Sequence, residues 1–229
     1  MPTSFTKGLL LFLFLCGMLT SKAQENLQGF WEPEIEVNYD LGKGYSHNFA
    51  LATRFYTYDD NALTLRTRQL EIGHFSDFKI RANQNFAVGI QYRWRENFEP
   101  DESDELRITE QYSITRAYRR FRLGHRFRLE QRIKDPHTEH RIRYRLALDT
   151  PLQGDKLNVG EPYLVVNTET LFSAGRSRNP GYEQRLEVVI GWQLAKGLML
   201  ETGLQYRLDD LTQRAQHEVF AGNSLSISF

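Results

Sequence analysis

Apolar and polar residues alternate along most of this chain. The clearest stretch runs from Phe121 to Lys134, where five of seven odd-numbered positions are apolar and six of seven even-numbered positions are charged. A helix would mix these two sets on every face, whereas successive side chains of a strand point to opposite faces. The pattern therefore predicts a strand with one apolar face and one charged face.

The same alternation recurs in ten further segments, which are separated by turn-forming residues such as Gly, Asn, Asp and Pro. These segments are 31–41, 45–55, 63–81, 86–95, 106–114, 141–149, 164–172, 185–192, 198–207 and 224–229. The longest of them, 63–81, is expected to contain a β-bulge. Because no segment has helical periodicity, the sequence predicts a single all-β domain with about eleven strands.

The first 23 residues have a different character and predict a cleaved secretory signal peptide. Lys7 supplies the positive charge, residues 8–19 form an apolar run too short to span a bilayer, and residues 21–23 fit a cleavage site. The alternative is a short buried helix. A lipoprotein signal is not expected, because Leu15 precedes Cys16 where a small residue is needed. The predicted barrel domain is therefore 24–229.

Charge and cysteine content narrow the class of protein. The whole chain carries 29 basic and 29 acidic residues, and removing Lys7 and Lys22 with the signal leaves a small negative excess. Such a balance does not favour nucleic acid as a partner. The single Cys16 also leaves with the signal, so an exported chain would need a large packed sheet or a membrane, not disulfides, for stability. No apolar stretch reaches 18 residues, which excludes a helical membrane protein.

A long antiparallel meander of this kind is expected to close into a barrel, because closure removes exposed strand edges. Strand lengths suited to a tilted bilayer crossing favour an outer-membrane barrel with lipid outside and charges in the lumen. A soluble periplasmic barrel that binds a hydrophobic ligand is the alternative orientation. Aromatic residues near strand ends also favour the membrane orientation; they are Tyr45, Phe55, Phe86, Trp94, Phe121, Tyr144, Phe172, Trp192 and Tyr206.

Two further features bear on this interpretation. Connections are expected to alternate between short turns on one side and longer loops on the other. The chain ends on an alternating strand with Phe229 as its last residue, which resembles the signal read by the barrel assembly machinery. Because bacterial barrels have even strand numbers, the count is expected to be ten or twelve, with twelve slightly favoured, in a closed antiparallel up-and-down barrel of 10–12 strands.

Three features together resemble the domain-of-unknown-function 2490 family: the start at Trp31, the Arg-rich hairpin 121–148 with Pro136 at its turn, and the terminal Phe229. The resemblance covers essentially the whole mature chain and implies an outer-membrane β-barrel of a Gram-negative bacterium. It implies no activity, ligand or catalytic residue.

Charged residues on the inward parity are the candidates for function. If they line a lumen, they form an arginine ladder that favours an anion-selective path. The alternative is a plug, in which the arginines pair with Glu71, Glu130, Glu169, Glu183, Glu187 and Glu201. The lumen-facing candidates are Arg93, Arg95, Arg107, Arg122, Arg126, Arg128, Glu130, Arg132, Arg141, Arg143, Arg145, Arg185, Glu187, Glu201 and Arg207.

Enzymatic alternatives rest on the histidines. His74 and His125 fall on the lipid-facing parity, where a serine partner would form a phospholipase-like site. His137 and His140, with Asp135 and Glu139, have the spacing of a weak metal site. No local signature supports either, so we expect no enzyme, no catalytic residue, no cofactor and no metal.

The sequence thus predicts a structural barrel or a narrow passive channel in the outer membrane, reached through a cleaved signal peptide. The expected partners are outer-membrane lipid and lipopolysaccharide, the barrel assembly machinery and small anionic solutes, with no nucleic acid. The remaining alternative is an outer-membrane enzyme acting on lipid or peptide.

Overall fold

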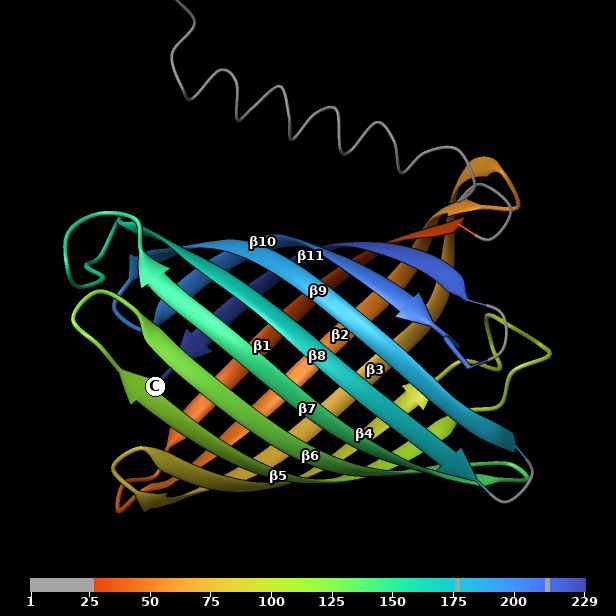
Figure 1. Cartoon of the computed structure of the whole chain (residues 1–229), viewed down its shortest axis with the longest axis horizontal. Helices are drawn as coiled ribbons and strands as arrows, with labels where there is room; N and C mark the ends of the chain where they lie inside the picture. Colours follow the sequence, from red (N-terminus) through yellow and green to blue (C-terminus); the bar gives the residue numbers. More distant parts are fainter. Residues whose placement is uncertain (1–26, 176–177, 213–214) are drawn as a thin grey trace, which may run out of the picture.

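The computed structural model describes residues 27–175, 178–212 and 215–229, which form one closed barrel of eleven strands (Figure 1). The predicted signal peptide lies outside the described residues. Within them, no helix is long and apolar enough to cross a membrane. The strands are β1 (Leu27–Asp40), β2 (Tyr45–Asp59), β3 (Ala62–Arg81), β4 (Gln84–Trp94), β5 (Glu105–Ala117), β6 (Arg122–Lys134), β7 (Thr138–Pro151), β8 (Pro162–Gly175), β9 (Arg178–Ala195), β10 (Leu198–Asp209) and β11 (Gln216–Ser228).

The predicted all-β up-and-down barrel is confirmed, but the expectation of an even strand number is wrong. Each strand pairs antiparallel with its neighbours in sequence, and the barrel is closed by a parallel pair between β1 and β11. An odd number of up-and-down strands leaves the first and last strands running in the same direction, so only a parallel ladder can join them. The predicted strand segment 31–41 corresponds to most of β1, one of the two strands of this closing pair.

This parallel closure puts the two ends of the described chain at opposite ends of the barrel. At one end, which we call the C-terminal rim, the backbone N–H of Asp40 donates to the carbonyl of Phe229 at 3.2 Å. The opposite end, where β1 begins, is the N-terminal rim (Figure 1).

The two rims do not differ in loop length as expected. The two longest connections are 95–104 and 152–161; the first lies at the N-terminal rim and the second at the C-terminal rim. Most other connections at both rims are short, such as the turn at Asp60 and Asn61, whose positive φ angles are typical of a tight hairpin. The predicted alternation of short turns with long loops is therefore wrong.

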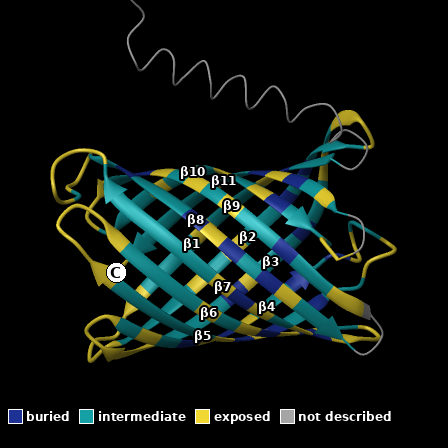
Figure 2. Cartoon of the chain, in the orientation of Figure 1, coloured by how far each residue is buried: buried dark blue, intermediate teal, exposed yellow. Residues whose placement is uncertain are grey.

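Register keeps the apolar positions of neighbouring strands on one face. Ile35 pairs with Leu51 on one side and with Leu225 on the other, and each of these side chains points outward. Buried and exposed residues alternate along the strands accordingly (Figure 2). The predicted bulge in β3 is confirmed, because the register between β2 and β3 shifts at Arg54 and Phe55.

Aromatic rings gather on the outer face toward both rims. Near the N-terminal rim, the rings of Trp31 and Phe55 stack with centroids 5.2 Å apart. Near the C-terminal rim, Tyr39 stacks on Phe229 at 5.1 Å, and another stacked pair lies beside them on β2 and β3. The outer wall is thus an apolar surface with an aromatic band toward each end.

The lumen side of the closing seam holds a small aromatic core. Phe30 and Phe220 stack across the parallel pair at 4.6 Å, and Tyr56 packs against Phe30 at 5.1 Å. The guanidinium of Arg207 lies 3.5 Å from the centroid of the Phe220 ring, and that of Arg54 lies 4.9 Å from it. These contacts pack the lumen side of the parallel pair near the start of its two strands.

Candidate functional site: the charged lumen

The structure places all of the lumen-facing candidates on the inward parity of their strands. Many of them are nearly inaccessible: Glu130 is 1% exposed, and Arg132 is 6% exposed. The inward set, read from the pairing register, comprises Arg93, Arg95, Arg107, Arg122, Arg126, Arg128, Glu130, Arg132, Arg141, Arg143, Arg145, Arg185, Glu187, Glu201 and Arg207.

Arginines face arginines across the neighbouring strands β5, β6 and β7. Arg107 lies opposite Arg132, and Arg128 lies opposite Arg143. Like charges directly opposite each other in a sheet are destabilising unless counter-charges lie between them. The ladder therefore depends on the carboxylates interleaved with it.

Glu130 and Glu169 are the central counter-charges. Arg143 donates from Nη1 to Glu130 at 2.6 Å and from Nη2 to Glu169 at 2.5 Å. Glu130 also lies 3.7 Å from Arg128, while Glu169 accepts from Arg126 at 2.9 Å. Each carboxylate is thus shared by several guanidinium groups, which ties β6, β7 and β8 together inside the wall.

Glu105 plays the same part nearer the N-terminal rim, although it was not among the lumen-facing candidates. It is 2% exposed and lies 2.5 Å from Arg107, 2.6 Å from Arg132 and 3.4 Å from Lys134. Glu105 lies two residues before Arg107 on the same strand and therefore on the same face, so the alternation of the sequence indicates that it points inward.

Most of the glutamates proposed as plug partners do pair with arginines. Glu201 differs, because it accepts from the Tyr163 hydroxyl at 2.5 Å and from Ser224 at 3.5 Å and pairs with no described cation. The remaining pairs are Arg93–Glu71 at 2.5 Å, Arg185–Glu183 at 2.5 Å and Arg145–Glu187 at 3.6 Å.

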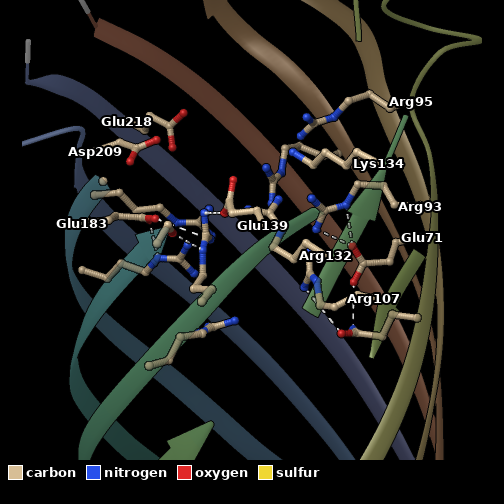
Figure 3. Close-up of a pocket in the computed structure, with 18 of the residues that line it drawn as sticks. Glu71, Arg93, Arg95, Arg107, Arg132, Lys134, Glu139, Glu183, Asp209 and Glu218 are labelled. Carbon is tan, nitrogen blue, oxygen red and sulfur yellow. Dashed lines mark hydrogen bonds and ion pairs between the residues drawn. The ribbon is translucent and has the colours of Figure 1, made fainter. Parts of the chain in front are cut away.

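The ion pairs do not fill the lumen. A first cavity of about 550 Å³ reaches the N-terminal rim and is lined there by Lys134, Asp209 and Glu218 (Figure 3). A second cavity of about 390 Å³ extends toward the C-terminal rim. Glu32, Glu34 and Arg207 line both cavities, so both spaces border these three side chains.

The two cavities differ in charge. Among the described residues, twelve cations and nine carboxylates line the first cavity. Two cations, Arg145 and Arg207, and five carboxylates line the second. Those carboxylates are Glu32, Glu34, Glu36, Glu187 and Glu201.

The sequence candidates are divided among these environments. Nine of them line the first cavity and four line the second, with Arg207 common to both. Arg126 and Glu130 line neither cavity, and Arg122 pairs with Asp149 at 2.9 Å at the C-terminal rim. The β1 glutamates Glu32, Glu34 and Glu36 were not among the lumen-facing candidates, although their alternation with Ile35 and Val37 indicates the inward face.

Two of the histidines considered as catalytic candidates lie on the outer face. His74 Nε2 lies 2.9 Å from His47 Nδ1, and the Ser76 hydroxyl lies 3.4 Å from the same His47 nitrogen. His125 Nδ1 lies 2.9 Å from the Tyr144 hydroxyl. One His47 nitrogen therefore faces both neighbours, whereas a catalytic triad orients its histidine through the second ring nitrogen.

The residues considered as a weak metal site lie on opposite faces of the wall. Glu139 points into the lumen and pairs with Arg132 at 2.8 Å, whereas His140 points outward. Among the described residues, no group of three or more His, Cys, Asp or Glu side chains could hold a metal ion.

The connection 95–104 is anchored by one carboxylate. Asp104 accepts from the backbone N–H groups of Arg95 at 2.7 Å and Glu96 at 3.0 Å, and from the Tyr92 hydroxyl at 2.9 Å. Chiefly because the Arg95 N–H stabilises the charged form, the pKa of Asp104 lies below its usual range.

Comparison with known families identifies one match. The profile of a family described as a protein of unknown function, DUF2490, matches residues 28–218, from the second residue of β1 to the third of β11. No curated protein matches the sequence.

Proposed function

We propose that this chain, which belongs to the domain-of-unknown-function 2490 family, is an outer-membrane β-barrel that provides a narrow passive path for small charged solutes. It is exported through its signal peptide, folds with the help of the barrel assembly machinery and meets lipid and lipopolysaccharide on its outer wall. It acts without a catalytic residue or cofactor.

One observation carries the proposal: the polarity of the barrel is inverted relative to a water-soluble protein. Charged side chains such as Glu105 and Arg107 are 2% and 7% exposed inside. Large apolar side chains such as Ile35 and Leu51 are 50% and 48% exposed outside. Water does not stabilise such an arrangement, because contiguous exposed apolar surface on this scale marks contact with another partner or with a membrane.

The aromatic bands support the same conclusion. Aromatic side chains are enriched at membrane–water interfaces, and here they lie on the outer face toward both rims, as in the pairs Trp31–Phe55 and Tyr39–Phe229. The apolar positions face outward, so the soluble alternative, which needs them inside around a hydrophobic ligand, lacks a pocket of that kind in the described barrel.

The passive path is supported by the two cavities. They occupy successive parts of the lumen and both border Glu32, Glu34 and Arg207, so that the path would narrow there. A rigid plug would instead fill the lumen with paired charges from rim to rim. The closing seam beside this narrowing is held by hydrogen-bonded backbone along β1 and β11, which keeps the wall intact around it.

The experiment has two stages. Outer-membrane fractions are examined on gels with and without boiling, because closed membrane barrels often resist SDS until heated. The purified protein is then inserted into a planar bilayer and its conductance is measured. A heat-dependent shift together with steady current supports the proposal. A soluble protein without a shift overturns the membrane location, and a membrane-inserted barrel without current overturns the path.

A further inference from the structure

We infer that the second cavity makes the path selective for cations, with Glu34, Glu36 and Glu201 as the residues that set this selectivity. The inference rests on the proposed passive path. It runs against the preference for anions that the arginine-rich sequence suggests, because selectivity depends on charge that is left uncompensated rather than on the number of arginines.

The arginines of the first cavity are largely compensated. Its twelve lining cations face nine lining carboxylates. Three further carboxylates, Glu105, Glu130 and Glu169, lie directly behind the guanidinium groups and are 1–4% exposed. These pairs lie at 2.5 to 2.9 Å for the closest contacts, so their fields cancel within a few ångströms.

The carboxylates of the second cavity are not compensated in this way. Arg145 pairs with Glu187 at 3.6 Å, and Arg207 pairs with Glu32 at 3.6 Å. These two ion pairs involve both of the cations that line the cavity. Three carboxylates, those of Glu34, Glu36 and Glu201, remain without an ion pair to a described residue and face the same space.

The position of these carboxylates allows them to determine which ions pass through the lumen. Glu34 lines both cavities, so every ion that passes between them meets it. Four further carboxylates line the second cavity with Glu34, those of Glu32, Glu36, Glu187 and Glu201. A charged lining inside a low-dielectric wall concentrates counter-ions, and the Debye length of about 10 Å at 0.1 M salt lets this field act across a narrow lumen.

Space for ions beside these carboxylates comes from a glycine of the closing seam. Gly203 on β10 lies directly opposite Gly222 on β11, and both line the second cavity. A side-chain carbon added at Gly222 would meet no other atom within 4 Å. At Gly203 an added side-chain carbon would meet the Val189 side chain at 2.7 Å, so the open space beside the carboxylates lies at Gly222.

The test is the reversal potential of the full-length mature protein in a planar bilayer under a potassium chloride gradient, at mildly alkaline pH so that carboxylates are ionised. We expect potassium to be favoured over chloride by about threefold or more in dilute salt. The variant carrying Glu34→Gln, Glu36→Gln and Glu201→Gln should lose this preference. The matched control is Glu110→Gln, the same chemical change on the outer face, where Glu110 lies between Val88 and Leu129.

Each outcome is decisive. If the unmodified protein prefers chloride, or prefers neither ion, the inference is overturned and the proposed path still stands. The same holds if the preference for cations survives in the triple variant. Absence of current overturns the path itself and the inference with it. A heat-dependent gel shift for every variant establishes that each has folded. Glu34→Gln alone removes no ion pair with a described residue and is a milder second variant. We expect it to change the reversal potential in the same direction as the triple variant, by a smaller amount.

Discussion

The rings of Phe30 and Phe220 stack 4.6 Å apart inside the lumen, across the parallel pair that closes the barrel. Both side chains are almost fully buried, at 1% and 2% exposed. The two strands they join lie at opposite ends of the chain, so this contact forms only when the barrel closes. The seam is thus stabilised by side-chain packing as well as by its backbone ladder.

Removing this contact should weaken closure. We expect Phe220→Ala to lower the free energy of unfolding by about 3 kcal/mol, because a buried aromatic ring is lost and leaves a void. The measurement is urea-induced unfolding in lipid vesicles, followed by the heat-dependent gel shift. Tyr118→Ala is the control, since Tyr118 lies in the connection between β5 and β6 at the C-terminal rim and is 43% exposed. Equal losses in both variants would contradict a specific role for the seam.

The shared carboxylate Glu130 should be more costly to neutralise than any exposed one. It lies within 4.0 Å of Arg107, Arg128 and Arg143 and is 1% exposed. We expect Glu130→Gln to destabilise the barrel by about 3 to 5 kcal/mol, because it leaves buried cations without their partner.

The same unfolding measurement distinguishes electrostatics from shape. Adding Arg143→Gln to Glu130→Gln should restore part of the lost stability, because it removes one of the surplus cations. If the changes in the free energy of unfolding of the two single variants simply add in the double variant, the charges do not interact as the distances indicate. Glu96→Gln, in the exposed connection 95–104, should change stability by about 0.5 kcal/mol or less.

Filling the second cavity should block the proposed path. We expect Gly222→Trp to reduce single-channel conductance at least severalfold, because its side chain enters space that no other atom occupies. Gly124→Trp is the matched control: Gly124 also faces inward with nothing within 4 Å, but it lines neither cavity. Similar conductance in the two variants would place the ion path elsewhere.

The anchoring of connection 95–104 should depend on pH. Because the folded pKa of Asp104 lies below its usual value of about 3.9, its contribution is present above that value and is lost as the pH falls through the folded pKa. We expect hydrogen exchange of the Arg95 and Glu96 amides to accelerate, relative to distant strand amides, as the pH falls through this range. In Asp104→Ala the acceleration should be present at every pH. An unchanged Asp104→Ala variant would show that this carboxylate does not hold the connection.

The outer-face histidines should not support hydrolysis. We expect the purified barrel to release no fatty acid from phospholipid in detergent, and His74→Ala and His125→Ala to behave as the unmodified protein does. The reason is that the Ser76 hydroxyl and His74 both face the same nitrogen of His47. Activity that either substitution abolishes would contradict the proposal of a barrel without a catalytic residue.

The sequence by itself determined the strands and their two faces. Alternation with period two is a local property, so the inward parity of Arg128 and Arg143 and the outward parity of Phe127 and Tyr144 follow without a structure. The bulge in β3 was also visible, as a break in that period. The family was identifiable from the start at Trp31 and the hairpin 121–148, both of which lie within the matched residues 28–218.

Only the tertiary structure decided how the barrel closes and where charge remains uncompensated. The parallel pairing of β1 with β11 joins residues almost 200 positions apart, such as Trp31 and Asn223, and no local pattern specifies that register. Parity gives the direction of a side chain but not its partner. Glu105 finds four cations and Glu201 finds none among the described residues, because the partner depends on strand stagger and lumen width, which exist only once the sheet has closed.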